Sequence, residues 1–315
     1  MFKIIIRRLL AAIPVLFLVS FIVFGLIALV PGDPAFTLAG EDPTPERIEL
    51  VSERLGLNDP FFVRYFRWLG GALQGDFGTS LYSSLTVTDA IAPRLPVTLS
   101  LTLVTLAFST MIGITSGLVS GLRPGRLVDR VTSSMTTFGI AVPHFWLALV
   151  LVVIFSLHFE LVPAVGYTPI SEGLWPWLSR LIIPAVALGS ASWAEISRQT
   201  RAGVATVMHE DYVRTAHSKG IAPAKVVFKH VMKNAAIPVV TVIGMQAGRL
   251  FGGSVIIEQI FGLPGIGTFA YRSVTNGDFP MIQGIVLIAA TVVLMLNLLV
   301  DISYTYFNPR VRAQR

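Results

Sequence analysis

Long apolar runs separated by polar segments define the organisation of this chain. Each run reaches about 20 residues or more, the length that a helix needs to cross the hydrocarbon core of a bilayer. None alternates polar and apolar positions as the strands of a membrane β-barrel would. The pattern predicts an all-α membrane protein with six transmembrane helices. These are Leu9–Val30, Val97–Leu122, Thr132–Leu157, Leu178–Ser197, Ile237–Ile257 and Ile282–Tyr304.

The fourth run differs from the others in its side chains. It is rich in Ala, Ser and Gly and contains Pro184. Small residues let helix backbones approach closely inside a membrane. We therefore expect this helix to be buried among the others.

Composition and charge support a membrane protein and indicate its orientation. Of the 315 residues, 53% are hydrophobic and only 13% are charged, against about 25% charged in soluble proteins. Lys3, Arg7 and Arg8 precede the first run, which predicts a cytoplasmic amino terminus. After six crossings the carboxyl terminus is cytoplasmic too. The cytoplasmic segments then hold sixteen Lys and Arg with five acidic residues, and the outer segments hold seven with thirteen. This asymmetry obeys the positive-inside rule.

A cleaved signal peptide is the alternative interpretation of the first run. The apolar stretch is too long for one, and no A-x-A cleavage site follows it. We therefore expect a retained transmembrane helix.

The polar segment after the first run predicts an external helical cap, not an independent domain. Thr44-Pro45-Glu46 is typical of a helix start, and Gly56 is a candidate stop. Asp59-Pro60 predicts a second helix, whose aromatic residues suit a membrane interface. The predicted organisation is residues 1–30 for the amino-terminal segment and first span, 31–96 for the cap, and 97–315 for a five-span core.

The cytoplasmic segment 198–236 mixes charged residues with helix formers. Tyr212, Val213, Ala216 and Gly220 share one helical face, and Gly220 can end that helix by adopting a positive φ. Pro223 begins a further, basic stretch. One interpretation is an amphipathic helix resting on anionic lipid. The short apolar face with small residues favours insertion into a groove of another protein.

The sequence predicts no catalytic, cofactor-binding or metal site. It has no cysteine, no P-loop and no H-E-x-x-H motif, and its five histidines are scattered. An intramembrane enzyme is therefore disfavoured. Gly265–Ala270 formally matches G-x-G-x-x-A, but no βαβ pattern surrounds it, so we interpret Gly262–Gly267 as a turn. Arg249 lies deep in the fifth run. It is either a cation facing the substrate or a structural residue bonded to carbonyls of neighbouring helices.

Several motifs, taken together, carry a family resemblance. In order and spacing they resemble, over essentially the full length, the permease subunits of bacterial ABC importers for dipeptides, oligopeptides, nickel and glutathione. The matching stretches are Arg8-Leu9-Leu10, Pro31-Gly32-Asp33-Pro34, Leu55-Gly56-Leu57, Gly75-Asp76-Phe77-Gly78-Thr79-Ser80, Asp211-Tyr212-Val213-Arg214-Thr215-Ala216, Lys219-Gly220, Asn234-Ala235-Ala236-Ile237-Pro238-Val239-Val240, Gly252-Gly253-Ser254 and Glu258-Gln259-Ile260-Phe261-Gly262-Leu263-Pro264-Gly265-Ile266-Gly267.

The resemblance implies a type I importer permease fold in the bacterial inner membrane, without catalytic residues. The implied partners are a second homologous permease, two ATPase subunits that bind the ATP, and an external solute-binding protein. Nucleic acid is not among them. Peptides are the expected substrates. The same machinery for glutathione or nickel chelates is an alternative, and a secondary transporter that needs no ATPase is a less favoured one.

The resemblance also implies a coupling helix, which docks into a cleft on an ATPase subunit. Its residues here are Tyr212, Val213, Arg214, Thr215, Ala216, Lys219 and Gly220, supported by His230, Asn234 and Pro238. Arg214 stands where the general family pattern has glutamate. Ion pairs of other importers therefore cannot be transferred to this chain.

Overall fold

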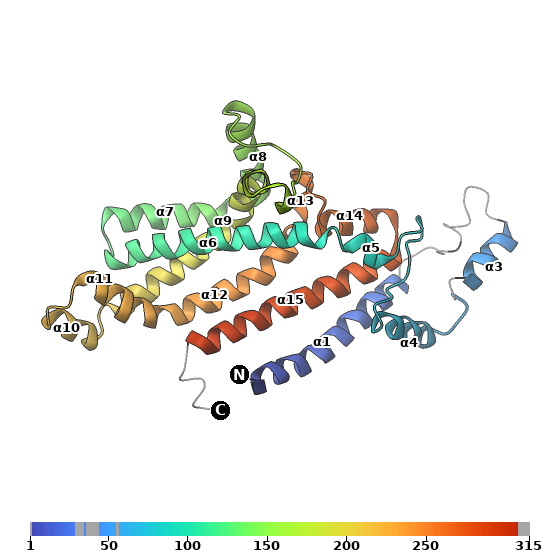
Figure 1. Cartoon of the computed structure of the whole chain (residues 1–315), viewed down its shortest axis with the longest axis horizontal. Helices are drawn as coiled ribbons and strands as arrows, with labels where there is room; N and C mark the ends of the chain where they lie inside the picture. The colour runs from blue at the N-terminus through green and yellow to red at the C-terminus, as the bar shows by residue number, and fades with distance from the viewer. Residues whose placement is uncertain (1, 29–34, 36–43, 55–56, 308–315) are drawn as a thin grey trace. The chain divides into compact units, whose positions relative to one another are not determined.

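The described part of the chain is built from helices. The computed structural model describes residues 2–28, 35, 44–54 and 57–307. Within these residues the only β-type pairing is an isolated bridge between Thr79 and Thr86. Figure 1 shows the order of the elements. They are α1 (Phe2–Ala28), α3 (Pro45–Arg54), α4 (Phe61–Ala72), α5 (Val87–Ile91), α6 (Leu95–Leu122), α7 (Leu127–Ala141), α8 (His144–Leu151), the π-helix η1 (Val152–His158), the 3₁₀-helix η2 (Ile170–Glu172), α9 (Leu174–Val207), α10 (Asp211–Ser218), α11 (Pro223–Val226), the π-helix η3 (Val227–Val231), α12 (Met232–Gly253), α13 (Val255–Ile260), α14 (Ile266–Asn276) and α15 (Phe279–Phe307).

Five described helices are long and apolar enough to cross a membrane, and a bent pair of helices supplies a sixth candidate. The bent pair corrects the third predicted span. Residues Leu127–Ala141 and His144–His158 meet at an angle of 105°, so a single continuous helix over Thr132–Leu157 is wrong. Pro143 explains the break, because proline lacks an N–H and disfavours helical geometry at the residue before it. Val142 accordingly has φ −83° and ψ 126°.

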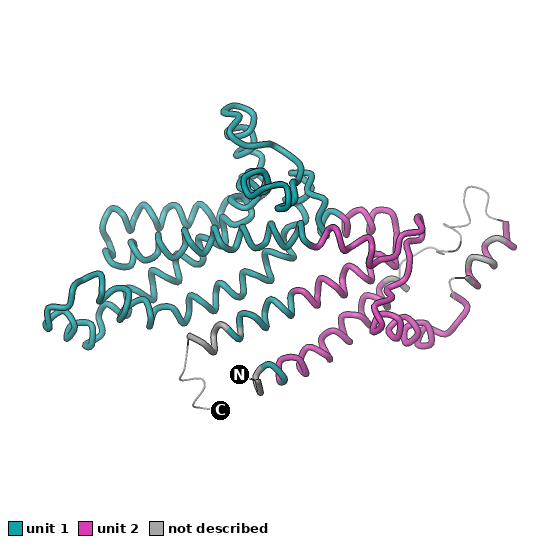
Figure 2. The backbone as a smooth tube through the Cα atoms, viewed as in Figure 1, with its two compact units in different colours: residues 1–6, 96–268, 293–315 teal, residues 7–95, 269–292 magenta. Residues whose placement is uncertain are grey.

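The chain divides into two compact units (Figure 2). Unit 1 comprises Met1–Ile6, Pro96–Thr268 and Val293–Arg315, and unit 2 comprises Arg7–Leu95 and Phe269–Val292. The described residues of the predicted cap, except Pro96, therefore belong to the same unit as most of α1.

Helix α9 is the centre of unit 1, where it packs against α7, α8 and α12 (Figure 1). Half of its most apolar window is buried, against 11% for α1. Gly113, Gly117 and Gly121 on α6 face α9 at one-turn spacing. A Cβ at Gly113 would lie 2.7 Å from Cγ2 of Ile196, and one at Gly121 would lie 2.8 Å from the Arg201 carbonyl oxygen. The expected burial of the fourth span is confirmed, and small residues of α9 such as Ala187, Gly189 and Ser190 are among those buried.

A buried carboxylate organises the predicted glycine- and proline-rich turn between α13 and α14. Glu258 is fully buried and accepts hydrogen bonds from Thr98 Oγ1 at 2.7 Å and from the Thr268 amide at 2.9 Å. A Cβ at Gly265 would lie 2.5 Å from the carboxyl carbon of Glu258. The turn therefore requires glycine where it passes over this carboxylate. The prediction of a turn is confirmed for residues 262–265, whereas Ile266 and Gly267 already belong to α14.

In unit 2, α4 packs on α1 through aromatic rings. Tyr65 is fully buried and its hydroxyl lies 2.9 Å from Ser20 Oγ. The rings of Phe17, Phe21 and Phe24 surround it at centroid distances of 5.2–5.9 Å. Helices α3 and α4 begin as predicted at Pro45 and just after Pro60, whereas the predicted stop at Gly56 lies outside the described residues.

Candidate functional site

The candidate site is the polar segment that joins α9 to α12 (Figure 1). Helix α10 follows Glu210 and carries Asp211 in its first turn, where a carboxylate complements the helix dipole. Gly220 adopts φ +71°, its amide donates to the His217 carbonyl at 2.9 Å, and the Ile221 amide donates to that of Ala216 at 3.3 Å. The predicted end of the helix by a positive φ at Gly220 is confirmed, and so is the helix start at Pro223.

The inner face of α10 is fixed by apolar packing. Val213 and Ala216 are buried in a cluster with Val204 of α9, Val226 of α11 and Ala235 of α12. A Cβ at Gly203 would lie 3.3 Å from the Cβ of Ala235, so α9 and α12 approach closely beside this cluster. Helix α10 therefore belongs to one apolar cluster with residues of α9, α11 and α12.

A polar contact adds to this packing. The side-chain amide of Asn234 donates to the Tyr212 hydroxyl at 3.0 Å and to the His230 carbonyl at 2.7 Å. His230 lies in η3, a π-helical turn of a kind often found at functional sites. Pro238 lies inside α12, one turn beyond Asn234. The three residues predicted to support the segment thus lie on its η3–α12 side, and Asn234 bonds directly to α10.

The outer face of α10 is polar and exposed. Tyr212, Arg214, Thr215 and Lys219 are exposed, as is Gly220. The Thr215 hydroxyl donates to the Asp211 carbonyl at 2.9 Å. The seven predicted coupling residues therefore divide into two groups. Val213 and Ala216 face inward, and the other five are available to a partner.

An ion pair that the sequence did not single out joins α7 to α9, the long helix that precedes α10. Asp129, at the start of α7, is bonded by Arg201 of α9 through Nε at 2.5 Å and Nη2 at 2.8 Å. It also accepts the Ser120 hydroxyl and, at 2.7 Å, the Gly125 amide. Arg201 precedes Val204 of the α10 cluster by three residues. The only sequence signal was one acidic residue among the basic residues of segment 123–130.

Arg249 lies on α12 with an exposed side chain. The described residues provide it with no hydrogen bond and no ion pair, so the structure shows none of the carbonyl bonds of its predicted structural role. Nor do the described residues include a group of three His, Asp or Glu side chains close enough to hold a metal ion.

Family models match almost the whole length of this chain. Residues 109–313 match the family model for binding-protein-dependent transport system inner membrane components, and residues 1–102 match the model for the amino-terminal part of such components. A chain of the inward-facing MetNI methionine ABC transporter superposes with a TM-score of 0.56 at 16% identity, covering 69% of this chain and 96% of that one. This likeness shows a shared fold.

Curated relatives match along almost their whole length. A probable peptide ABC transporter permease of Sinorhizobium fredii is 37% identical, covering 98% of both chains. The dipeptide transport permease DppB of Alkalihalophilus pseudofirmus is 37% identical over 97% of this chain and 98% of its own. The glutathione transport permease GsiC of Escherichia coli K12 is 38% identical over 99% of both. The chain therefore belongs to the family of binding-protein-dependent transport system inner membrane components.

Proposed function

We propose that this inner membrane component forms half of the translocation pathway of an ATP-driven importer for peptides. The curated relatives are named for peptides, dipeptides and glutathione, itself a small peptide. Their identity of 37–38% over nearly the whole chain supports the same substrate class. The working assembly contains a second, homologous permease, two ATPase subunits and an external solute-binding protein.

We also propose that α10 couples this subunit to an ATPase subunit. The observation that supports this proposal is that α10 has a buried apolar inner face and an exposed polar outer face. Because Val213 and Ala216 share one apolar cluster with residues of α9, α11 and α12, a displacement of α10 is transmitted through this cluster to two long helices. Transport then needs no chemistry in this chain, because the partners stabilise different conformations of the same helices.

The same division argues against α10 as a lipid-bound helix. An interfacial helix buries an apolar face among headgroups. In α10 that face is already covered by the chain's own residues, and Arg214, Thr215 and Lys219 point outward. The outer face is suited to a polar groove on another protein.

Single-cysteine crosslinking tests the coupling role, and the chain has no cysteine of its own. We expect Thr215→Cys, in the assembled complex, to crosslink to an ATPase subunit through a thiol-to-amine reagent. Thr275→Cys is the matched control, because Thr275 is also exposed and also bonds the carbonyl four residues earlier, at 3.1 Å, but lies on the predicted outer side. Ala216 is unsuitable because it is buried.

Two results would contradict the proposal. Free labelling of Thr215→Cys by a bulky water-soluble maleimide in the complex, without any crosslink, would remove α10 from the ATPase interface. Uptake by the purified chain alone, without ATP, would instead indicate a secondary transporter.

A further inference from the structure

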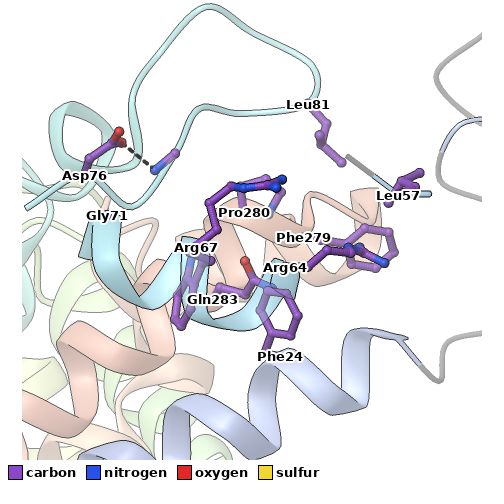
Figure 3. A pocket seen from close by; sticks show the side chains of 12 residues that line it. Phe24, Leu57, Arg64, Arg67, Gly71, Asp76, Leu81, Phe279, Pro280 and Gln283 are labelled. Atoms are coloured by element: carbon purple, nitrogen blue, oxygen red, sulfur yellow. Dashed lines mark hydrogen bonds between the residues drawn. The ribbon is translucent and has the colours of Figure 1, made fainter. Parts of the chain in front are cut away.

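Unit 2 contains a pocket that the proposed transport role leaves unexplained (Figure 3). Its volume is about 310 Å³, and it is formed by the end of α1, by α4, by the loop after α4 and by the start of α15. Its charged and polar lining includes Arg64, Arg67, Asp76 and Gln283, and Phe24 and Phe279 are among its apolar walls. We call it the outer pocket.

The outer pocket holds two guanidinium groups, one of which has no acidic partner among the described residues. Arg64 lies over the ring of Phe24, 6.0 Å from its centroid, and the described residues give it no ion pair. Arg67 pairs with Asp59 at 2.8 Å, but the two side chains are 62% and 41% exposed. Exposed pairs of this kind are weak and exchange readily. Each guanidinium therefore retains donors for an anionic ligand.

The pocket also contains an acidic residue, Asp76, which forms no ion pair with either arginine among the described residues. Its carboxylate accepts the Gly78 amide at 2.9 Å. Figure 3 shows this bond at one end of the pocket, away from the Arg64 side chain. The Arg64 end is thus rich in donors and bordered by aromatic rings.

The position of the pocket along α1 places it at the level of lipid headgroups. The apolar window of α1 is Ile5–Leu26, and Phe24 lies near its end, far from Lys3 and the other basic residues of the amino terminus. Apolar side chains on α1 and α4, among them Leu26, Phe62 and Phe66, are exposed. Tryptophan concentrates at membrane interfaces, and Trp68 of α4 lines the pocket.

We propose that the outer pocket binds the phosphodiester of an anionic phospholipid. Arg64 and Arg67 bind the phosphate oxygens, since the planar guanidinium matches phosphate geometry with two parallel hydrogen bonds. The acyl chains lie along the exposed apolar side chains of α1 and α4. Inorganic phosphate would satisfy the arginines but would leave these apolar surfaces unused.

Native mass spectrometry of the purified chain tests this directly. Phosphatidylglycerol and phosphatidylcholine are offered in mixed micelles, and retained lipid is counted. We expect phosphatidylglycerol to be retained in preference, and the double variant Arg64→Gln/Arg67→Gln to retain about tenfold less, because it loses charge-assisted hydrogen bonds. Arg272→Gln is the control, because Arg272 is an exposed arginine of the same unit that does not line the pocket.

A second measurement covers the case in which the double variant fails to fold. Trp68 lines the pocket, so brominated phosphatidylglycerol should quench its fluorescence in the wild-type chain, and Trp68→Phe should remove that part of the quenching.

Four outcomes would overturn the proposal. Equal retention by the double variant and the control would remove the arginines from lipid binding. Equal retention of the two lipids, which share a phosphodiester, would contradict selectivity for an anionic headgroup. Displacement of phosphatidylglycerol by millimolar inorganic phosphate would indicate a free-phosphate site. Crosslinking of position 64 to an external solute-binding protein, without lipid retention, would indicate a protein partner.

Discussion

The ion pair between Asp129 and Arg201 provides a sharp test of how the ends of α6, α7 and α9 on the predicted cytoplasmic side are held together. The side chain of Asp129 is 5% exposed and that of Arg201 is 38% exposed. The two partners therefore differ in what happens when the other is removed. A buried carboxylate that loses its cation stays buried, whereas Arg201 can turn toward water.

The expected magnitudes follow from this asymmetry. Arg201→Gln should lower the free energy of unfolding by about 3–5 kcal/mol, the range for breaking a buried pair by removing one partner. Asp129→Asn should cost about 1–2 kcal/mol, since asparagine retains an oxygen for Ser120 or for the Gly125 amide. The double variant should cost about as little as Asp129→Asn alone, because no charge is then left buried.

Reversible unfolding in mixed micelles by titration with SDS, followed by far-UV circular dichroism, measures these free energies for the four proteins of the double-mutant cycle. We expect the effects to deviate from additivity by about 3–5 kcal/mol, the cost of Arg201→Gln alone. The cycle on Arg67 and Asp59 is the control, because that exposed pair should give less than about 1 kcal/mol. Equal coupling energies in the two cycles would refute the assignment of Asp129 as a carboxylate stabilised mainly by Arg201.

Three further predictions concern single positions. Gly220→Val should leave the protein in the membrane but abolish transport, because a β-branched residue resists φ +71°. Gly220→Asn, which tolerates a positive φ, should retain uptake, and equal uptake by both variants would contradict this role. Gly117→Ala should destabilise the chain by about 1–3 kcal/mol, since the added methyl overlaps Ser197 and Thr200 of α9. Gly70→Ala, which meets nothing within 4 Å, should stabilise it slightly through helix propensity, so a shift of thermal unfolding in the same direction for both would be evidence against close α6–α9 packing. Arg249→Gln should leave assembly intact and selectively reduce uptake of peptides with a free carboxylate relative to amidated ones; unchanged uptake of both would exclude Arg249 from the pathway.

Those features that depend on neighbouring residues in the chain were predictable from the sequence. Apolar length marks candidate spans because the bilayer sets a minimum helix length. Proline marked the starts of α3, α4 and α11, since its fixed φ suits entry into a helix. Gly220 marked the end of α10, because glycine adopts a positive φ without a steric penalty. The family was recognisable for a similar reason, since its motifs keep their order and spacing along the chain.

Contacts between distant segments required the tertiary structure. Pro143 and Pro184 look alike in sequence, yet the first separates two helices and the second lies inside α9. The helical pattern placed Val213, Ala216 and Tyr212 on one face, but only packing against α9, α11 and α12 buried the first two and left Tyr212 exposed. In the sequence, Asp129 and Glu258 do not differ from other acidic residues. Folding brings Arg201, 72 positions later, within hydrogen-bonding distance of Asp129. It also brings Thr98, 160 positions earlier, within hydrogen-bonding distance of Glu258. Local rules determine φ, ψ and apolar length, whereas burial and pairing depend on which side chains folding brings together.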